Sequence, residues 1–135
     1  MTDPAYNPSY ILRGDGFWQA LDQLVSEHEM VIDRPKGSRH PRYPQVIYPL
    51  DYGYFDGTTT IDGGGLDVFC GSIAASQLTG VVLTVDLIKR DVEVKLLLGC
   101  TADDQHIILD FLNEGRMRAM FIPRPDPPDQ GHSSG

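Results

Sequence analysis

Two neighbouring apolar segments, residues 81–88 and 92–98, constrain the fold of this chain more than any other feature. Along the second segment apolar and polar residues alternate, so that its valines point one way while Asp91, Glu93 and Lys95 point the other. A period of two is typical of a strand with one buried face. Because the connection between the segments is short, we expect an antiparallel hairpin at the centre of a sheet.

Shorter patterns predict the other elements. We expect a first helix over residues 16–28 with Asp15 as its N-cap, and a second helix that starts at Thr101 and stops at Gly115. Asp104 follows Thr101 by three residues, which predicts a capping box. Strands or extended segments are expected at residues 30–33, 45–49, 53–55, 66–71 and 117–122. Together these elements predict a mainly β, α+β domain: a small, closed or nearly closed β-barrel that carries two helices.

The length of 135 residues suits one domain, which we place at residues 15–122. Residues 1–14 read as an extended arm, and residues 123–135 as a disordered tail with almost no apolar content. Cys70 and Cys100 each end an apolar run and are expected to be buried thiols. No apolar run is long enough to cross a membrane and the N-terminus lacks a signal-peptide pattern, so the cytoplasm is the expected location.

A formal net charge of −8 limits the partners of this chain. Proteins that bind nucleic acid or anionic membranes through phosphate groups normally carry an excess of basic residues, so neither is expected here. An acidic protein can still bind an anion if a metal ion lies between them, because the ion reverses the local charge.

The segment Asp62-Gly63-Gly64-Gly65-Leu66-Asp67 is an acidic, glycine-rich loop. Glycines let the backbone approach a ligand closely, and carboxylate oxygens are the ligands that Mg²⁺ prefers. The alternative is a solvated turn, in which Asp and Gly are simply common residues.

A second acidic pair lies at the central hairpin. A turn centred on Ile88 and Lys89 would set Asp86 directly opposite Asp91, and facing like charges destabilise a strand pair. A bridging cation would remove that repulsion. Alternatively, the basic residues nearby neutralise both carboxylates as ordinary surface pairs.

A basic loop precedes these acids and holds Lys36, Arg39 and Arg42, of which the arginines can grip phosphate oxygens in a bidentate manner. Tyr48 and Tyr52 follow and can donate hydroxyl hydrogen bonds to the same anion, although packing in the barrel would also explain them.

Three segments in this order resemble the family of soluble inorganic pyrophosphatases, and the likeness to its short bacterial members extends over residues 17–122. The segments are Val31-Ile32-Asp33-Arg34-Pro35, Tyr48-Pro49-Leu50-Asp51-Tyr52-Gly53-Tyr54, and Thr58 through Asp62 to Val68. The resemblance implies a five-stranded, OB-like barrel and hydrolysis of pyrophosphate to two phosphates with Mg²⁺, or Mn²⁺, as the cofactor. It also implies a homo-oligomer.

The same resemblance assigns roles to residues by position. It implies metal ligands at Asp33, Asp62, Asp67, Asp86 and Asp91, and phosphate contacts from Lys36, Arg39, Arg42, Tyr48, Tyr52 and Lys95. It implies catalytic roles for Asp62, Asp67, Tyr52 and Arg42.

Two departures from the family pattern bear on activity. Gly64 stands where the family has a third loop carboxylate, so metal binding and activation of the nucleophile should be weakened. Glu93 stands where the family has a lysine, and if Glu93-Val94-Lys95 is the matching stretch, Glu93 replaces Asp91 as the ligand.

The sequence therefore predicts a pyrophosphatase with impaired activity, with a degenerate phosphate- or nucleotide-binding regulatory module as the alternative. A generic OB-fold binder of nucleic acid is disfavoured by the acidic charge and the few aromatic residues.

Overall fold

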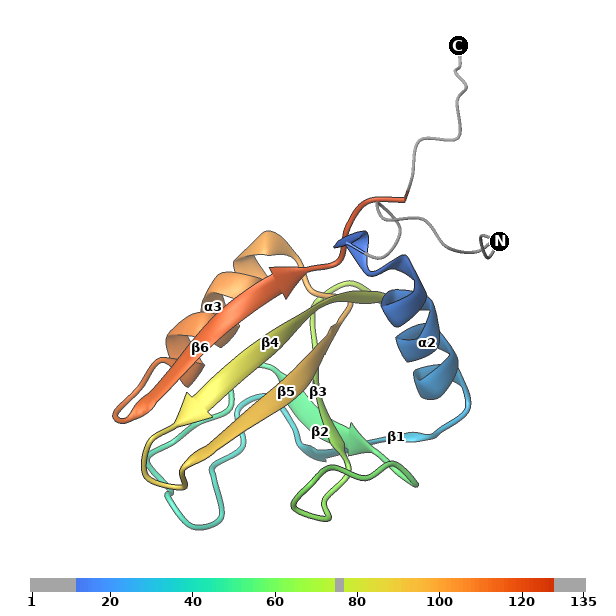
Figure 1. Cartoon of the computed structure of the whole chain (residues 1–135). Helices are drawn as coiled ribbons and strands as arrows, with labels where there is room; N and C mark the ends of the chain where they lie inside the picture. Colours follow the sequence, from blue (N-terminus) through green and yellow to red (C-terminus); the bar gives the residue numbers. More distant parts are fainter. Residues whose placement is uncertain (1–11, 75–76, 128–135) are drawn as a thin grey trace, which may run out of the picture.

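The computed structural model describes residues 12–74 and 77–127, which form one six-stranded sheet and two principal helices (Figure 1). The strands are β1 (Met30–Arg34), β2 (Asp51–Phe55), β3 (Leu66–Cys70), β4 (Leu78–Asp86), β5 (Asp91–Leu98) and β6 (Met117–Pro123). The helices are α2 (Asp15–Ser26) and α3 (Ala102–Leu112). The predicted mixed α+β class is thus confirmed.

The strand order is β1-β2-β3-β5-β4-β6, and every neighbouring pair is antiparallel except β3 and β5. The sheet is open, so the expected five-stranded closed barrel is not confirmed. In the described sheet, β1 pairs with β2 and β6 pairs with β4, so β1 and β6 are its two edge strands. Residues 45–49, expected to be extended, form only a single bridge between Arg39 and Ile47.

The central hairpin has the predicted register, because Asp86 of β4 pairs with Asp91 of β5. The turn between them is closed by a bond from the Arg90 N–H to the Asp86 carbonyl at 2.8 Å. Arg90 adopts a φ of 61°, a left-handed conformation that only a minority of non-glycine residues take. The Asp86 carboxylate accepts the N–H groups of Ile88 and Lys89 and so stabilises the same turn.

The two helix starts differ in how well the sequence predicted them. Thr101 and Asp104 form the predicted capping box at the start of α3. The N-cap of α2 is Gly14 with a φ of 73°, so the prediction of Asp15 as the cap is wrong. Asp15 lies instead in the first turn, where its negative charge interacts favourably with the positive end of the helix dipole. Its Oδ1 atom also pairs with Arg13 Nε at 3.2 Å.

Each face of the sheet packs its own hydrophobic cluster, because side chains alternate along every strand. The cluster on the α3 side contains Leu50, Phe69, Val82, Leu97, Cys100, Ile108 and Leu112. The cluster on the α2 side contains Trp18, Phe55, Val68, Leu78, Val81 and Leu96. Cys70 and Cys100 are free thiols; Cys100 is buried as predicted, whereas Cys70 is only partly buried. Neither α2 nor α3 has the length and apolar content of a membrane-crossing helix.

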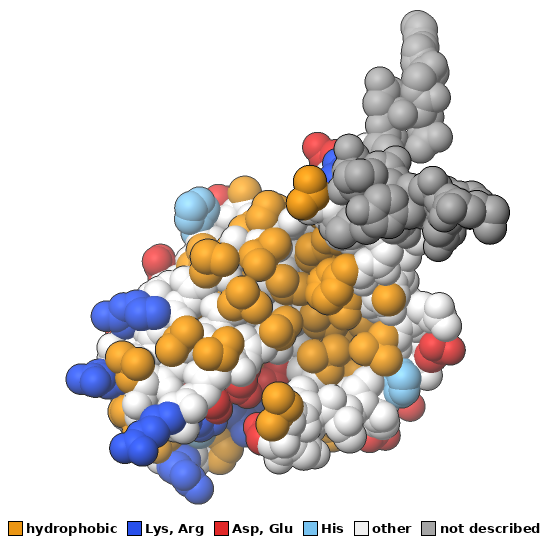
Figure 2. All heavy atoms as spheres, viewed as in Figure 1, with side chains coloured by type: hydrophobic (Ala, Val, Ile, Leu, Met, Phe, Trp, Pro, Cys, Tyr) orange, Lys and Arg blue, Asp and Glu red, His pale blue; other side chains and the backbone are white. Residues whose placement is uncertain are grey.

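On its α2 side, the sheet is covered only in part by the described chain. Beyond the end of α2, Val85, Val92, Val94 and Met120 are at least 40% exposed and continue the apolar surface of β4, β5 and β6 (Figure 2). The opposite side of the same strands carries Asp86, Glu93 and Lys95, so the polar chemistry of the hairpin is confined to the α3 side.

Gly53 of β2 is required by the close approach of β1. A Cβ atom at this position would lie 1.8 Å from the Val31 carbonyl oxygen. We expect Gly53→Ala to lower the free energy of unfolding by about 3 kcal/mol or more, since β1 must move away to admit a methyl group. Gly64→Ala is the control, because its Cβ would meet only Asp62 Oδ1, at 3.4 Å. Urea denaturation followed by circular dichroism tests this, and equal stability of the two variants would contradict it.

Candidate functional site

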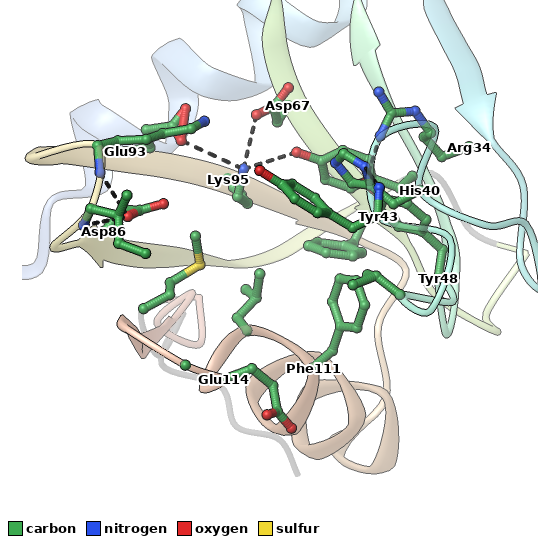
Figure 3. A pocket seen from close by; sticks show the side chains of 18 of the residues that line it. Arg34, His40, Tyr43, Tyr48, Asp67, Asp86, Glu93, Lys95, Phe111 and Glu114 are labelled. Atoms are coloured by element: carbon green, nitrogen blue, oxygen red, sulfur yellow. Dashed lines mark hydrogen bonds and ion pairs between the residues drawn. The ribbon is translucent and has the colours of Figure 1, made fainter.

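A cavity of about 770 Å³ opens on the α3 side of the sheet, between the hairpin, the loop of residues 35–50 and the end of α3 (Figure 3). Its acidic lining residues are Asp33, Asp62, Asp67, Asp86, Glu93 and Glu114, and its basic ones are Arg34, Lys89, Lys95 and Arg116. The cavity therefore carries more acidic than basic side chains, in keeping with the net charge of the whole chain.

Lys95 occupies the base of this cavity with a side chain that is only 8% exposed. Its Nζ atom donates to the Tyr52 hydroxyl at 2.8 Å and to Asp67 Oδ2 at 3.0 Å, and Glu93 Oε2 lies 4.0 Å away (Figure 3). The fold brings them together because β3 lies between β2 and β5. Pairing of Val68 with Leu96 sets Asp67 beside Lys95.

The surroundings of Lys95 and Tyr52 set the protonation states of both groups. Burial acts to lower the pKa of Lys95, but Tyr52 and the carboxylates of Asp67 and Glu93 outweigh it and raise that pKa above its ordinary value. Burial raises the pKa of the Tyr52 hydroxyl. At neutral pH the pair is therefore a lysine cation and an uncharged phenol, and both can donate hydrogen bonds.

Aromatic rings form the wall beside Lys95. Tyr48 and Tyr52 stack with centroids 5.3 Å apart, and Phe111 of α3 lies 5.3 Å from the Tyr48 ring. Arg34 donates to the Tyr48 hydroxyl at 2.6 Å. Tyr48 is only 6% exposed, so packing accounts for its ring, while its hydroxyl serves to hold Arg34 at the cavity.

Arg34 reaches the cavity through a β-bulge. Residues 33 and 34 should point to opposite faces of a regular strand. In β1, however, Ile32 pairs with Gly53 and Arg34 with the adjacent Tyr52, so Asp33 is an extra residue. Both Asp33 and Arg34 consequently line the cavity.

Two of the cavity carboxylates are engaged within their own loops. Asp62 Oδ1 accepts the Thr60 hydroxyl at 2.5 Å and the Gly64 N–H at 3.1 Å, and these hydrogen bonds lower the pKa of Asp62. Asp86 Oδ1 accepts backbone N–H groups of the hairpin turn at 2.9 and 3.0 Å. Each acid thus stabilises the turn in which it lies.

The described residues do not fit a preassembled magnesium centre. Across residues 12–74 and 77–127, no three Asp, Glu, His or Cys side chains lie close enough together to hold a metal ion. Asp67 pairs with Lys95, and the oxygens of Asp62 and Asp86 named above face their own loops. Metal ligation by Asp33, Asp62, Asp67, Asp86 and Asp91 therefore stays a prediction.

The sequence-predicted residues divide into two groups. The cavity brings together Asp33, Asp62, Asp67, Asp86, Tyr48, Tyr52 and Lys95. Its lining does not include Asp91, Lys36, Arg39 or Arg42. Glu93 lines the cavity, whereas Asp91 does not. The backbone N–H of Lys36 donates to Asp51, and the Arg39 guanidinium donates to the Pro44 carbonyl.

Sequence reasoning missed Arg34, Tyr43 and Phe111 as lining residues. Arg34 stands next to Asp33 in the matched segment, but the bulge that turns it inward has no signal in the sequence. Phe111 lies on α3 and packs against the α3-side cluster.

Comparison with known proteins identifies no family model and no curated protein that matches this chain. Among solved structures, an inorganic pyrophosphatase from Coxiella burnetii aligns with a TM-score of 0.38 and 17% sequence identity. The alignment covers 57% of this chain and 62% of that one.

The two partners of the buried ion pair should respond differently to mutation. We expect Asp67→Asn to lower the free energy of unfolding by about 1–3 kcal/mol, because it leaves the Lys95 cation buried without its closest carboxylate. Lys95→Met should cost less, since Asp67 is 29% exposed and can be hydrated while methionine fills the space. Urea denaturation at pH 7 compares them, and a larger loss for Lys95→Met would refute this account.

Proposed function

We propose that this chain is a pyrophosphatase-like protein whose cavity binds a phosphoanhydride, with pyrophosphate as the simplest ligand. The observation that carries the proposal is the almost fully buried cation of Lys95 at the base of the cavity, surrounded by groups that orient it. The resemblance of the sequence segments to pyrophosphatases supports the same class of ligand.

The donors at the cavity base have capacity left for an anion. A lysine ammonium carries three hydrogens, of which Tyr52 and Asp67 accept two, so one remains for a ligand. The Tyr52 hydroxyl accepts from Lys95 and is hydrogen-bonded to the Asp67 carboxylate, so it orients the ammonium group. Arg34 uses one guanidinium nitrogen on Tyr48 and has further donors. These groups are held in place before a ligand arrives, which lowers the entropic cost of binding.

The acidic surplus of the lining bears on how the anion enters. Pyrophosphate is a multiply charged anion and would be repelled by the carboxylates of Asp62, Asp86 and Glu93 unless a cation accompanies it. We propose that it binds together with Mg²⁺ or Mn²⁺, which neutralises part of both charges.

Binding of pyrophosphate in the presence of Mg²⁺, measured by isothermal titration calorimetry, tests this proposal. We expect Lys95→Met to weaken binding about tenfold or more, since a hydrogen bond from a charged donor is lost. Arg118→Met removes a positive charge from an exposed side chain outside the cavity lining and should leave the affinity unchanged. An equal loss in both variants, or no binding by the wild-type protein, would rule out the proposed site.

Slow hydrolysis of the bound pyrophosphate is the second candidate function. It is favoured by the room at Gly64 for the missing carboxylate, in the loop where Asp62 borders the cavity.

We expect slow release of phosphate from pyrophosphate by the wild-type protein with Mg²⁺, and faster release by Gly64→Asp, because a third loop carboxylate would strengthen metal binding. Gly64→Ala is the matched control and should not gain activity. A colorimetric phosphate assay measures the rates. No release by any of the three proteins, while pyrophosphate still binds, would leave binding alone as the function.

A further inference from the structure

The cavity is larger and more varied than a bare pyrophosphate ion requires, and we infer that its ligand is a nucleoside diphosphate. This inference rests on the proposed binding of a phosphoanhydride at Lys95 and adds the chemical class of the rest of the ligand. The diphosphate would occupy the Lys95 end, and the base would lie against the aromatic side chains at the far end.

The size of the cavity is the first argument. Its volume of about 770 Å³ lies within the range of roughly 300–1,000 Å³ that is typical of pockets for drug-sized organic ligands. Lys95 lies on β5, Tyr52 on β2 and Arg34 on β1, so all three groups are on the side of the cavity formed by the sheet. In Figure 3, Phe111 and Glu114 lie on the opposite side of the view from Asp67 and Lys95.

An available aromatic surface is the second argument. The rings of Tyr48 and Tyr52 are already stacked on each other. Tyr43 also lines the cavity, but it is 51% exposed. Its ring contacts His40 with centroids 5.1 Å apart and an interplanar angle of 42°, so the two rings are not stacked face to face. A large part of the Tyr43 ring is therefore open to a planar ligand, and nucleobases stack well on such rings.

The chemistry of the far end is the third argument. Phe111 and Met117 supply apolar surface from α3 and β6, while Gln45 and Glu114 supply polar groups. An amide can pair with the edge of a nucleobase, and a carboxylate can accept the hydrogens of an exocyclic amino group. An inorganic anion has no use for the apolar groups and would be repelled by Glu114, whereas an uncharged base with an amino group matches both.

Calorimetric titration of the full chain with ADP and with pyrophosphate, each with Mg²⁺, tests this inference. We expect ADP to bind about tenfold or more tightly than pyrophosphate. Tyr43→Ala should weaken ADP binding about tenfold while the affinity for pyrophosphate is retained, because only the base touches that ring. Tyr43→Phe keeps the ring and should keep the ADP affinity. Phe17→Ala removes an exposed ring on α2, away from the cavity, and should change neither affinity.

The outcomes separate this inference from the proposed function. If pyrophosphate binds and ADP binds no more tightly, the nucleoside diphosphate is overturned and the phosphoanhydride site stands. If Tyr43→Ala weakens both ligands equally, Tyr43 does not hold a base and the inference fails. If neither ligand binds, the inference and the proposed function are both wrong.

Discussion

The buried ammonium group of Lys95 links three adjacent strands, and the geometry of the cavity depends on it. Its partners are Tyr52 of β2 and Asp67 of β3, and Lys95 itself lies on β5. A charge with so little access to water is stable only when it is paired and hydrogen-bonded. Any shift of β3 relative to β2 or β5 would break these contacts, so the ion pair and the strand register reinforce each other. The base of the cavity is consequently held in one arrangement before any ligand binds.

Around this base the hydrogen-bond donors are gathered, while the acids are distributed. Lys95, Tyr52 and Arg34 all reach the sheet side of the cavity, whereas Asp62 and Asp86 are held by the backbones of two separate turns. The described carboxylates are therefore not gathered at one point of the cavity. The absence of a carboxylate at Gly64 fits the same description.

The division of the sheet into two faces explains how a small domain holds such a site. The α2 side takes part of the core, with Trp18 and Leu96 in its cluster. The α3 side packs the other cluster near the end of β5 and leaves the remainder of that face to Glu93 and Lys95. β1, which carries Arg34, packs closely against β2 at Gly53. A polar cavity thus lies directly beside a packed core, which excludes water from one side of Lys95.

The sequence by itself determined the features that depend on neighbours along the chain. Alternation set the hairpin and the pairing of Asp86 with Asp91, and local hydrogen bonding set the Thr101–Asp104 capping box. The resemblance also pointed to several of the polar residues that line the cavity. Tertiary structure decided the open strand order, the bulge that turns Arg34 inward, and the presence of Glu93 but not Asp91 in the cavity lining. It also decided that Asp67 pairs with Lys95. These features depend on contacts between residues far apart in the chain, which a local pattern does not encode.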